Sequence, residues 1–110
     1  MDKIRILGVD YDVLVEDVVI LEGQACYGCI EHNDAVIRLQ RGNAPQKQTE
    51  TVIHEILHGI INAFDPVGQL GMSNEVEERV VRTLGRGLYQ VIKDNGTEFL
   101  QDKHWADSDK

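Results

Sequence analysis

The chain has 110 residues and a mass of 12.4 kDa, which is enough for one folded domain and too little for a second hydrophobic core. Eleven lysines and arginines against nineteen aspartates and glutamates give a formal charge of −8, which disfavours phosphate backbones and anionic lipid surfaces as partners. We therefore expect no nucleic acid and no membrane partner, and a single domain over residues 1–110 with a flexible tail at about 106–110.

The first seven residues mix charged and apolar side chains and contain no long apolar segment followed by a small-residue cleavage site. Nowhere does the sequence contain the run of about 18 apolar residues that crosses a bilayer. The two cysteines, Cys26 and Cys29, are too few for the disulfide framework of small secreted domains. These features predict a cytoplasmic protein.

Residues from about 4 to 40 have the pattern of β-strands, in which β-branched residues are interrupted by turn residues. The expected strands are 4–7, 11–15, 18–21, 25–30 and 35–39. The last two are separated by a polar four-residue turn and predict a hairpin. We expect a small, mostly antiparallel sheet of three or four strands.

A long helix is predicted over about 45–64. Asn43 is a candidate cap, and Pro45 suits a first helical turn because its missing N–H would be unpaired there. The apolar residues recur at helical spacing and form one stripe: Val52, Ile53, Ile56, Leu57, Ile60, Ile61 and Phe64. The Asp65-Pro66 pair ends this helix.

A second long helix is predicted over about 74–94. Ser73 or Asn74 caps it, with Glu77 three residues after Asn74 as in a capping box. Its apolar face comprises Val76, Val80, Val81, Leu84, Leu88, Val91 and Ile92. Gly96 supplies the C-terminal stop, and a short terminal helix follows it. The fold class is therefore α+β, with the sheet packed on two long helices.

The chemistry is concentrated in the segment His54-Glu55-Ile56-Leu57-His58. Residues four apart on a helix differ by about 40° in azimuth and about 6 Å in rise, so two imidazoles at this spacing can hold one metal ion. Glu55 projects near the same flank, where its carboxylate can take a proton from a metal-bound water without being a ligand. This is the HExxH arrangement of zinc peptidases.

A catalytic zinc usually has three protein ligands, so a third must come from elsewhere. The second helix is expected to pack antiparallel on the first, and its first turns return to the level of His58. Glu75, Glu77 and Glu78 all qualify. The mean direction of the apolar face favours Glu77, whereas the position of the histidines on the flank of their own stripe favours Glu78.

The wider segment from Thr51 to Ile60, with a glutamate twenty positions after the second histidine at Glu78, resembles the gluzincin pattern of thermolysin-like enzymes. It is similar to the ImmA/IrrE metallopeptidases, and in particular to the short members found in phages and prophages. The resemblance is most specific over residues 51–95. It implies a minimal zincin-like fold in which His54, His58 and Glu78 hold Zn²⁺ and Glu55 is catalytic. Val81 departs from the pattern, since many relatives have alanine three residues after the ligand glutamate.

The function that follows is that of a hydrolase, a zinc-dependent metalloprotease that cleaves a peptide bond of a protein or peptide substrate through metal-activated water, with Glu55 as general base. The alternative is a non-catalytic, zinc-stabilised binding or regulatory module of the same fold, in which the ligands hold the two helices together.

Three other features have simpler interpretations. Cys26 and Cys29 lack the second cysteine pair of a structural zinc site, and residues three apart on one strand point to opposite faces, so both are expected to be small packing residues. His32 is expected to be solvent-exposed in a turn. Trp105 is a candidate anchor for the C-terminal segment.

Overall fold

The computed structural model describes residues 2–104. Within this range the elements are β1 (Asp2–Ile6), β2 (Val9–Glu16), β3 (Val19–Leu21), β4 (Gln24–Cys26), β5 (Gly28–Glu31), β6 (Val36–Gln40), α1 (Pro45–Phe64), α2 (Asn74–Asn95) and the 3-10 helix η1 (Glu98–Leu100). Both long helices lie where the sequence predicts them, and η1 is the short terminal helix. The expected tail at 106–110 and Trp105 lie outside the described residues.

The strands form two sheets, and the α+β class is confirmed. The larger sheet has the order β1-β2-β6-β5, in which β1 and β5 pair antiparallel with their neighbours while β2 and β6 run parallel. The smaller sheet is the antiparallel pair of β3 and β4. Three of the four pairings are therefore antiparallel, and the hairpin predicted for the last two strands is that of β5 and β6.

Two tight turns explain how the first strands pair. Leu7 and Gly8 join β1 to β2, and Glu22 and Gly23 join β3 to β4, with positive φ at all four residues. Paired positive φ angles define the type I′ turn, whose twist matches that of antiparallel strands. The expected strand over 25–30 is divided at Tyr27 into β4 and β5, which belong to different sheets.

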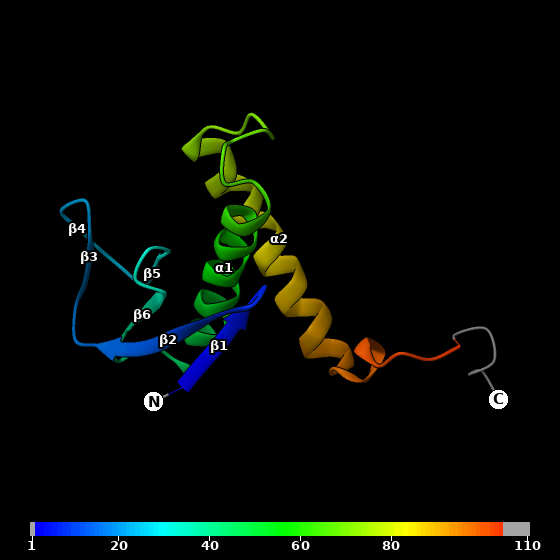
Figure 1. Ribbon diagram of the computed structural model, residues 1–110. Coiled ribbons are helices and arrows are strands. Elements are labelled where there is room, and N and C mark those ends of the chain that lie inside the picture. The colour runs from blue at the N-terminus through cyan, green and yellow to red at the C-terminus, as the bar shows by residue number, and fades with distance from the viewer. Residues whose placement is uncertain (1, 105–110) are drawn as a thin grey trace.

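The hydrophobic core lies between the larger sheet and α1 (Figure 1). Its buried members come from β1, β2 and β6: Ile6, Tyr11, Ile37 and Leu39. Three residues of α1 at helical spacing pack against them, namely Val52, Ile56 and Ile60. This packing fixes the rotation of α1 about its axis and leaves one flank of the helix for α2.

The helix α2 starts beside the end of α1 and diverges from it towards the C-terminus (Figure 1). Its buried residues are Val81, Gly85 and Tyr89. Val81 is the only buried member of the apolar face expected from the periodicity, whereas Leu84, Leu88 and Val91 are 57%, 40% and 47% exposed. The contact with α1 instead follows a row in which the small Gly85 lies against Leu57 and the backbone of His54.

The helix caps differ in part from expectation. Asn43 does not cap α1: its side-chain amide donates to Gln40 O, and Ala44 is the cap residue before Pro45. Ser73 caps α2 by accepting a hydrogen bond from Val76 N. Among the described residues, no helix combines the length with the apolar character needed to span a bilayer.

Candidate metal centre

The two histidines of the HExxH segment lie one turn apart on the flank of α1 that faces α2. Their ring centroids are 4.9 Å apart and their planes are inclined by 63°. The side chains are mostly buried, with exposed fractions of 23% for His54 and 17% for His58. Burial lowers the pKa of His54, which favours the neutral imidazole that a metal ion binds.

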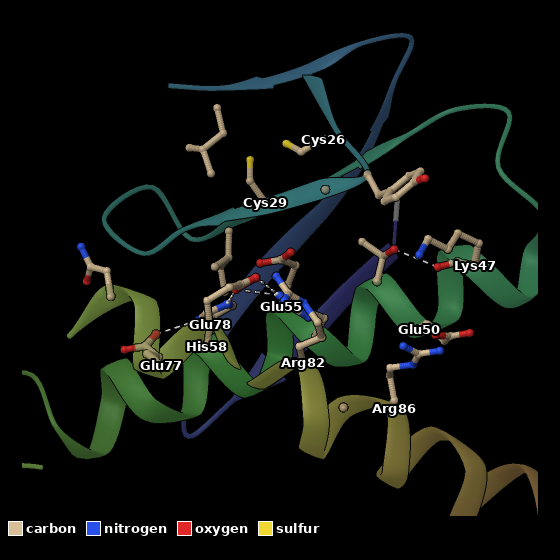
Figure 2. Close-up of a pocket in the computed structure, with 18 of the residues that line it drawn as sticks. Cys26, Cys29, Lys47, Glu50, Glu55, His58, Glu77, Glu78, Arg82 and Arg86 are labelled. Atoms are coloured by element: carbon tan, nitrogen blue, oxygen red, sulfur yellow. Dashed lines mark hydrogen bonds and ion pairs between the residues drawn. The ribbon is translucent and has the colours of Figure 1, made fainter. Parts of the chain in front are cut away.

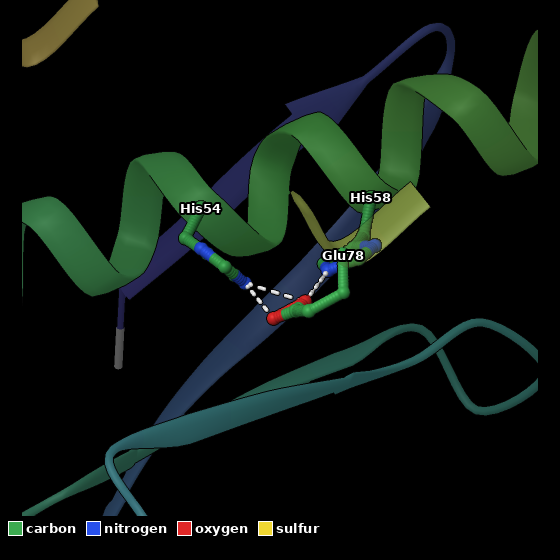
Figure 3. Close-up of side chains that lie close together, drawn as sticks. All are labelled: His54, His58 and Glu78. Carbon is green, nitrogen blue, oxygen red and sulfur yellow. Dashed lines mark hydrogen bonds and ion pairs between the residues drawn. The ribbon is translucent and has the colours of Figure 1, made fainter. Parts of the chain in front are cut away.

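Glu78 of α2 brings its carboxylate between the two imidazoles (Figure 3). Its Oε1 lies 2.8 Å from His54 Nε2, and its Oε2 lies 3.1 Å from His58 Nε2. One ligand atom from each of the three residues can be chosen so that all lie within 4.8 Å of one another. Glu78 therefore converges with His54 and His58 on one point, although it lies 24 and 20 positions after them in the sequence.

The donor set suits a divalent ion such as Zn²⁺. Two imidazole nitrogens and one carboxylate oxygen form the three-ligand set of a catalytic zinc site. Ligand bonds of about 2.0–2.1 Å in a tetrahedron separate neighbouring ligand atoms by about 3.3 Å. The single oxygen Oε2 of Glu78 lies 3.2 Å from His54 Nε2 and 3.1 Å from His58 Nε2, slightly closer than this separation. Small rotations of these partly exposed side chains would therefore open the space that an ion needs.

Glu77 does not share this point, although the periodicity of α2 favoured it. Its Oε2 lies 2.7 Å from Nδ1 of His58, on the far side of the ring from Glu78. A carboxylate at Nδ1 holds the N–H on that nitrogen, which leaves Nε2 as the metal-binding atom. Glu77 thus has the geometry of an orienting residue for a histidine ligand.

Glu55 lies in the same cleft and is only 6% exposed. Burial raises its pKa to about 7 from the ordinary 4.5, while the nearby His58 acts in the opposite direction. A carboxyl group with a pKa near neutrality exchanges protons readily in both directions at physiological pH. Its position beside the histidines and its burial are those required of a general base.

The centre opens into a cleft of about 1010 Å³ between the helices and the strands β4 and β5. Figure 2 shows the helices forming one wall, with Glu55, His58 and Glu78 on it, and Cys26 and Cys29 on the opposite wall. The cysteines lie on different strands and both line the cleft, so the expectation of one strand with opposite faces was wrong. Cys29 is buried and Cys26 is half-buried.

His32 was also misjudged from the sequence. It lines the cleft, and its Nδ1 is buried without a hydrogen-bond partner among the described residues. Burial and the neighbouring His58 lower its pKa. Asn33 and Asp34 of the same turn are exposed, and the turn pattern carries no information on which of its residues points inward.

Comparison with known proteins adds one weak similarity. No family model matches the chain, and no solved structure matches it. A segment of 97 residues, which is 88% of this chain, is 27% identical to part of the sphingolipid C9-methyltransferase B of Emericella nidulans. The chain spans 18% of the length of that methyltransferase. A similarity of this size does not assign the chain to the methyltransferase's family.

Proposed function

We propose that the protein is a zinc-dependent metallopeptidase of the ImmA/IrrE-like type that hydrolyses a peptide bond of a protein or peptide. The observation that carries the proposal is the convergence of His54, His58 and Glu78 from two helices beside the buried carboxyl group of Glu55. The sequence resemblance to gluzincins supports the same assignment, because it rests on these four residues. A cytoplasmic location remains part of the proposal.

The proposed roles follow from the positions of the side chains. His54, His58 and Glu78 would hold the ion, and Glu77 would orient the imidazole of His58. A bound zinc ion supplies positive charge that polarises a water molecule and the carbonyl group of the substrate. Glu55 accepts a proton from the attacking water and returns it to the amine nitrogen as the C–N bond breaks, so that the products are a carboxylate and an amine.

The edge strand β5 offers a way to bind the substrate. It pairs with β6 on one side only in the larger sheet, and it lines the cleft through Gly28, Cys29 and Ile30. An extended peptide can add to such an edge as a further strand, since the backbone supplies the hydrogen bonds. Substrate backbone would then lie between β5 and the proposed metal ligands.

Replacement of Glu55 by glutamine tests this function. We expect Glu55→Gln to bind one zinc ion per chain, as the wild type does, and to lose hydrolysis of a casein or peptide substrate at least 100-fold. Zinc content is measured by elemental analysis after gel filtration. Hydrolysis that is unchanged in Glu55→Gln, or a wild type that binds no zinc, would refute the proposal.

A structural zinc site is the second candidate. The ligands come from both α1 and α2, and α2 packs chiefly on α1, so an ion at this point would tie the two helices together. This candidate predicts zinc-dependent stability with no peptidase activity in the wild type. Both candidate functions use the same metal ligands. They differ in whether the zinc-loaded wild type hydrolyses peptides.

A further inference from the structure

Three cations line the cleft without a carboxylate partner. In the sheet region every lysine and arginine forms an ion pair: Lys3 with Asp12, Arg5 with Asp10, Arg38 with Glu16 and Glu31, and Arg41 with Asp17. Within residues 2–104, Lys47, Arg82 and Arg86 form no ion pair, although acidic residues outnumber basic ones by nineteen to eleven in the chain. Lys47 instead places its Nζ 4.3 Å from the ring centroid of Tyr27.

These cations lie together at one end of the cleft. Figure 2 shows Arg82 and Arg86 on α2 on the side of the candidate metal centre away from Glu77, with Lys47 beyond them on α1. The sequence reinforces the separation of charge, because residues 79–93 of α2 contain four basic residues and no acidic one. The cleft is therefore acidic where the proposed ligands lie and basic at its far end.

The spacing of the two arginines matches that of an extended peptide. Arg82 and Arg86 follow Glu78 at intervals of four residues, so each lies about 6 Å further along α2 and on nearly the same face. Side chains of an extended chain that share one face recur every two residues, at about 6.6 Å. A peptide strand alongside α2 would therefore present alternate side chains to successive arginines.

The direction of β5 decides which part of the peptide meets them. A Cβ atom at Gly28 would meet Thr51, and one at Gly59 would meet Ile30, so β5 runs in the same direction as α1. A peptide that adds antiparallel to β5 therefore runs from the His58 end of the cleft towards Lys47. The basic end then receives residues on the C-terminal side of the bond to be cleaved.

Building on the proposed peptidase function, we propose that Arg82, Arg86 and Lys47 form an anion-binding subsite that selects peptides with a carboxylate C-terminal to the cleaved bond. The carboxylate belongs to an acidic side chain or to the end of the peptide. A guanidinium group binds a carboxylate through paired, charge-assisted hydrogen bonds, and the exposed side chains of Arg82 and Arg86 are accessible to a bound peptide. Glu50 also lines the cleft at this end (Figure 2), and its negative charge opposes the binding of an anion there.

Binding to the Glu55→Gln variant tests the subsite without requiring catalysis. The probes are fluorescein-labelled, C-terminally amidated decapeptides that carry glutamate, glutamine or lysine at two positions two residues apart. With zinc present, we expect the glutamate peptide to bind about tenfold more tightly than the glutamine peptide, and the lysine peptide to bind most weakly. A further glutamine peptide with a free C-terminus shows whether the terminal carboxylate is the preferred ligand.

Three further variants make the measurement specific. Arg82→Gln with Arg86→Gln is expected to abolish the preference for carboxylates, whereas Arg79→Gln, on the same helix but outside the lining of the cleft, is expected to keep it. Glu50→Gln is expected to strengthen binding of the glutamate peptide severalfold. Equal affinity for all peptides, or a preference that survives loss of both arginines, would overturn the proposal.

A further experiment separates the proposed subsite from the proposed peptidase function. The zinc-loaded wild type is incubated with a randomised decapeptide mixture, and the cleaved bonds are identified by mass spectrometry. Enrichment of acidic residues after the cleaved bonds supports both. Cleavage without that enrichment refutes the subsite and leaves the peptidase function intact. Carboxylate-dependent binding in a wild type that cleaves nothing refutes the peptidase function and leaves the subsite.

Discussion

Nδ1 of His58 lies 2.7 Å from Oε2 of Glu77, opposite the ring nitrogen that faces the neighbouring Glu78. Two consecutive glutamates of α2 thus contact the two nitrogens of one imidazole. In metal sites such a second carboxylate fixes the ring orientation and the proton position of the ligand histidine. The pair therefore gives two adjacent, chemically identical side chains different roles.

The first prediction concerns this difference. Glu78→Gln is expected to abolish stoichiometric zinc binding, whereas Glu77→Gln is expected to weaken it about 10- to 100-fold because the ring of His58 loses its orienting partner. Zinc affinity is measured by competition with a chromogenic chelator. Glu75→Gln, a change at an exposed position of the first turn of α2, serves as the control. The reverse order of the two losses would identify Glu77 as the ligand.

The second prediction concerns the buried carboxyl group of Glu55. Burial raises its pKa to about 7 from 4.5, so the native state binds this proton more tightly than the unfolded state does. The stabilisation is complete below pH 4.5 and is lost as the pH rises through 7. From pH 4 to pH 8, the metal-free wild type should lose up to about 3 kcal/mol of unfolding free energy relative to Glu55→Gln.

Urea denaturation in the presence of EDTA measures this difference, and the comparison with Glu55→Gln cancels the titration of all other groups. The amount by which the unfolding free energy of the wild type falls below that of Glu55→Gln, relative to the same comparison at pH 4, must grow as the pH rises. A value that does not change between pH 4 and pH 8 would show that Glu55 titrates normally in the folded chain.

The third prediction concerns the reactivity of the two thiols. Burial raises the pKa of Cys29 to about 11, and burial raises the pKa of Cys26 as well. Since the thiolate is the reactive form, iodoacetamide at pH 8 is expected to modify the half-buried Cys26 first and the buried Cys29 only when the protein unfolds. Peptide mapping over time distinguishes the sites. Equal rates in the native protein would contradict the burial of Cys29.

The fourth prediction compares two glycines. A Cβ atom at Gly28 would lie 2.6 Å from Thr51 Cγ2 and 2.7 Å from the backbone oxygen of Arg38, so Gly28→Ala should destabilise the fold by about 1–3 kcal/mol. Gly87 has nothing within 4 Å of the same position, so Gly87→Ala should stabilise α2 by about 1 kcal/mol through helix propensity. Chemical denaturation of both variants is the measurement, and effects of the same sign would contradict it.

The sequence predicted the two helices well because long amphipathic periodicity and strong breakers coincide. Pro45 lies at the start of α1, Asp65 follows its end, and Gly96 with a φ of 70° follows α2. The strands were harder to predict. Gly8 and Gly23 are local signals for the two type I′ turns. The parallel pairing of β2 with β6, in contrast, joins segments that no local sequence pattern connects.

The third ligand shows a subtler limit. Periodicity pointed to a face centred on Leu84 and Leu88, whereas the buried row of α2 runs through Val81 and Gly85, and Glu78 lies on the same side as that row. A glycine contributes nothing to a hydrophobicity pattern, yet Gly85 is buried beside Leu57 and the backbone of His54. The geometric argument for Glu78 therefore led to the residue that meets the histidines although it took the wrong face as its reference.

The parallel pairing of β2 and β6 makes residues 17–35 an insert that leaves β2 after Glu16, beside Gln40, and enters β6 at Val36, beside Asp12. Backbone hydrogen bonds from Asp12 N to Ala35 O and from Arg41 N to Glu16 O hold those ends in the larger sheet. A change in the length of such an insert alters the free energy of folding only slightly, because the entropic cost of closing a loop rises slowly with its length. The β3–β4 part of this insert, which lies outside the larger sheet, can accordingly change in length while the helices that carry the reactive groups keep their positions.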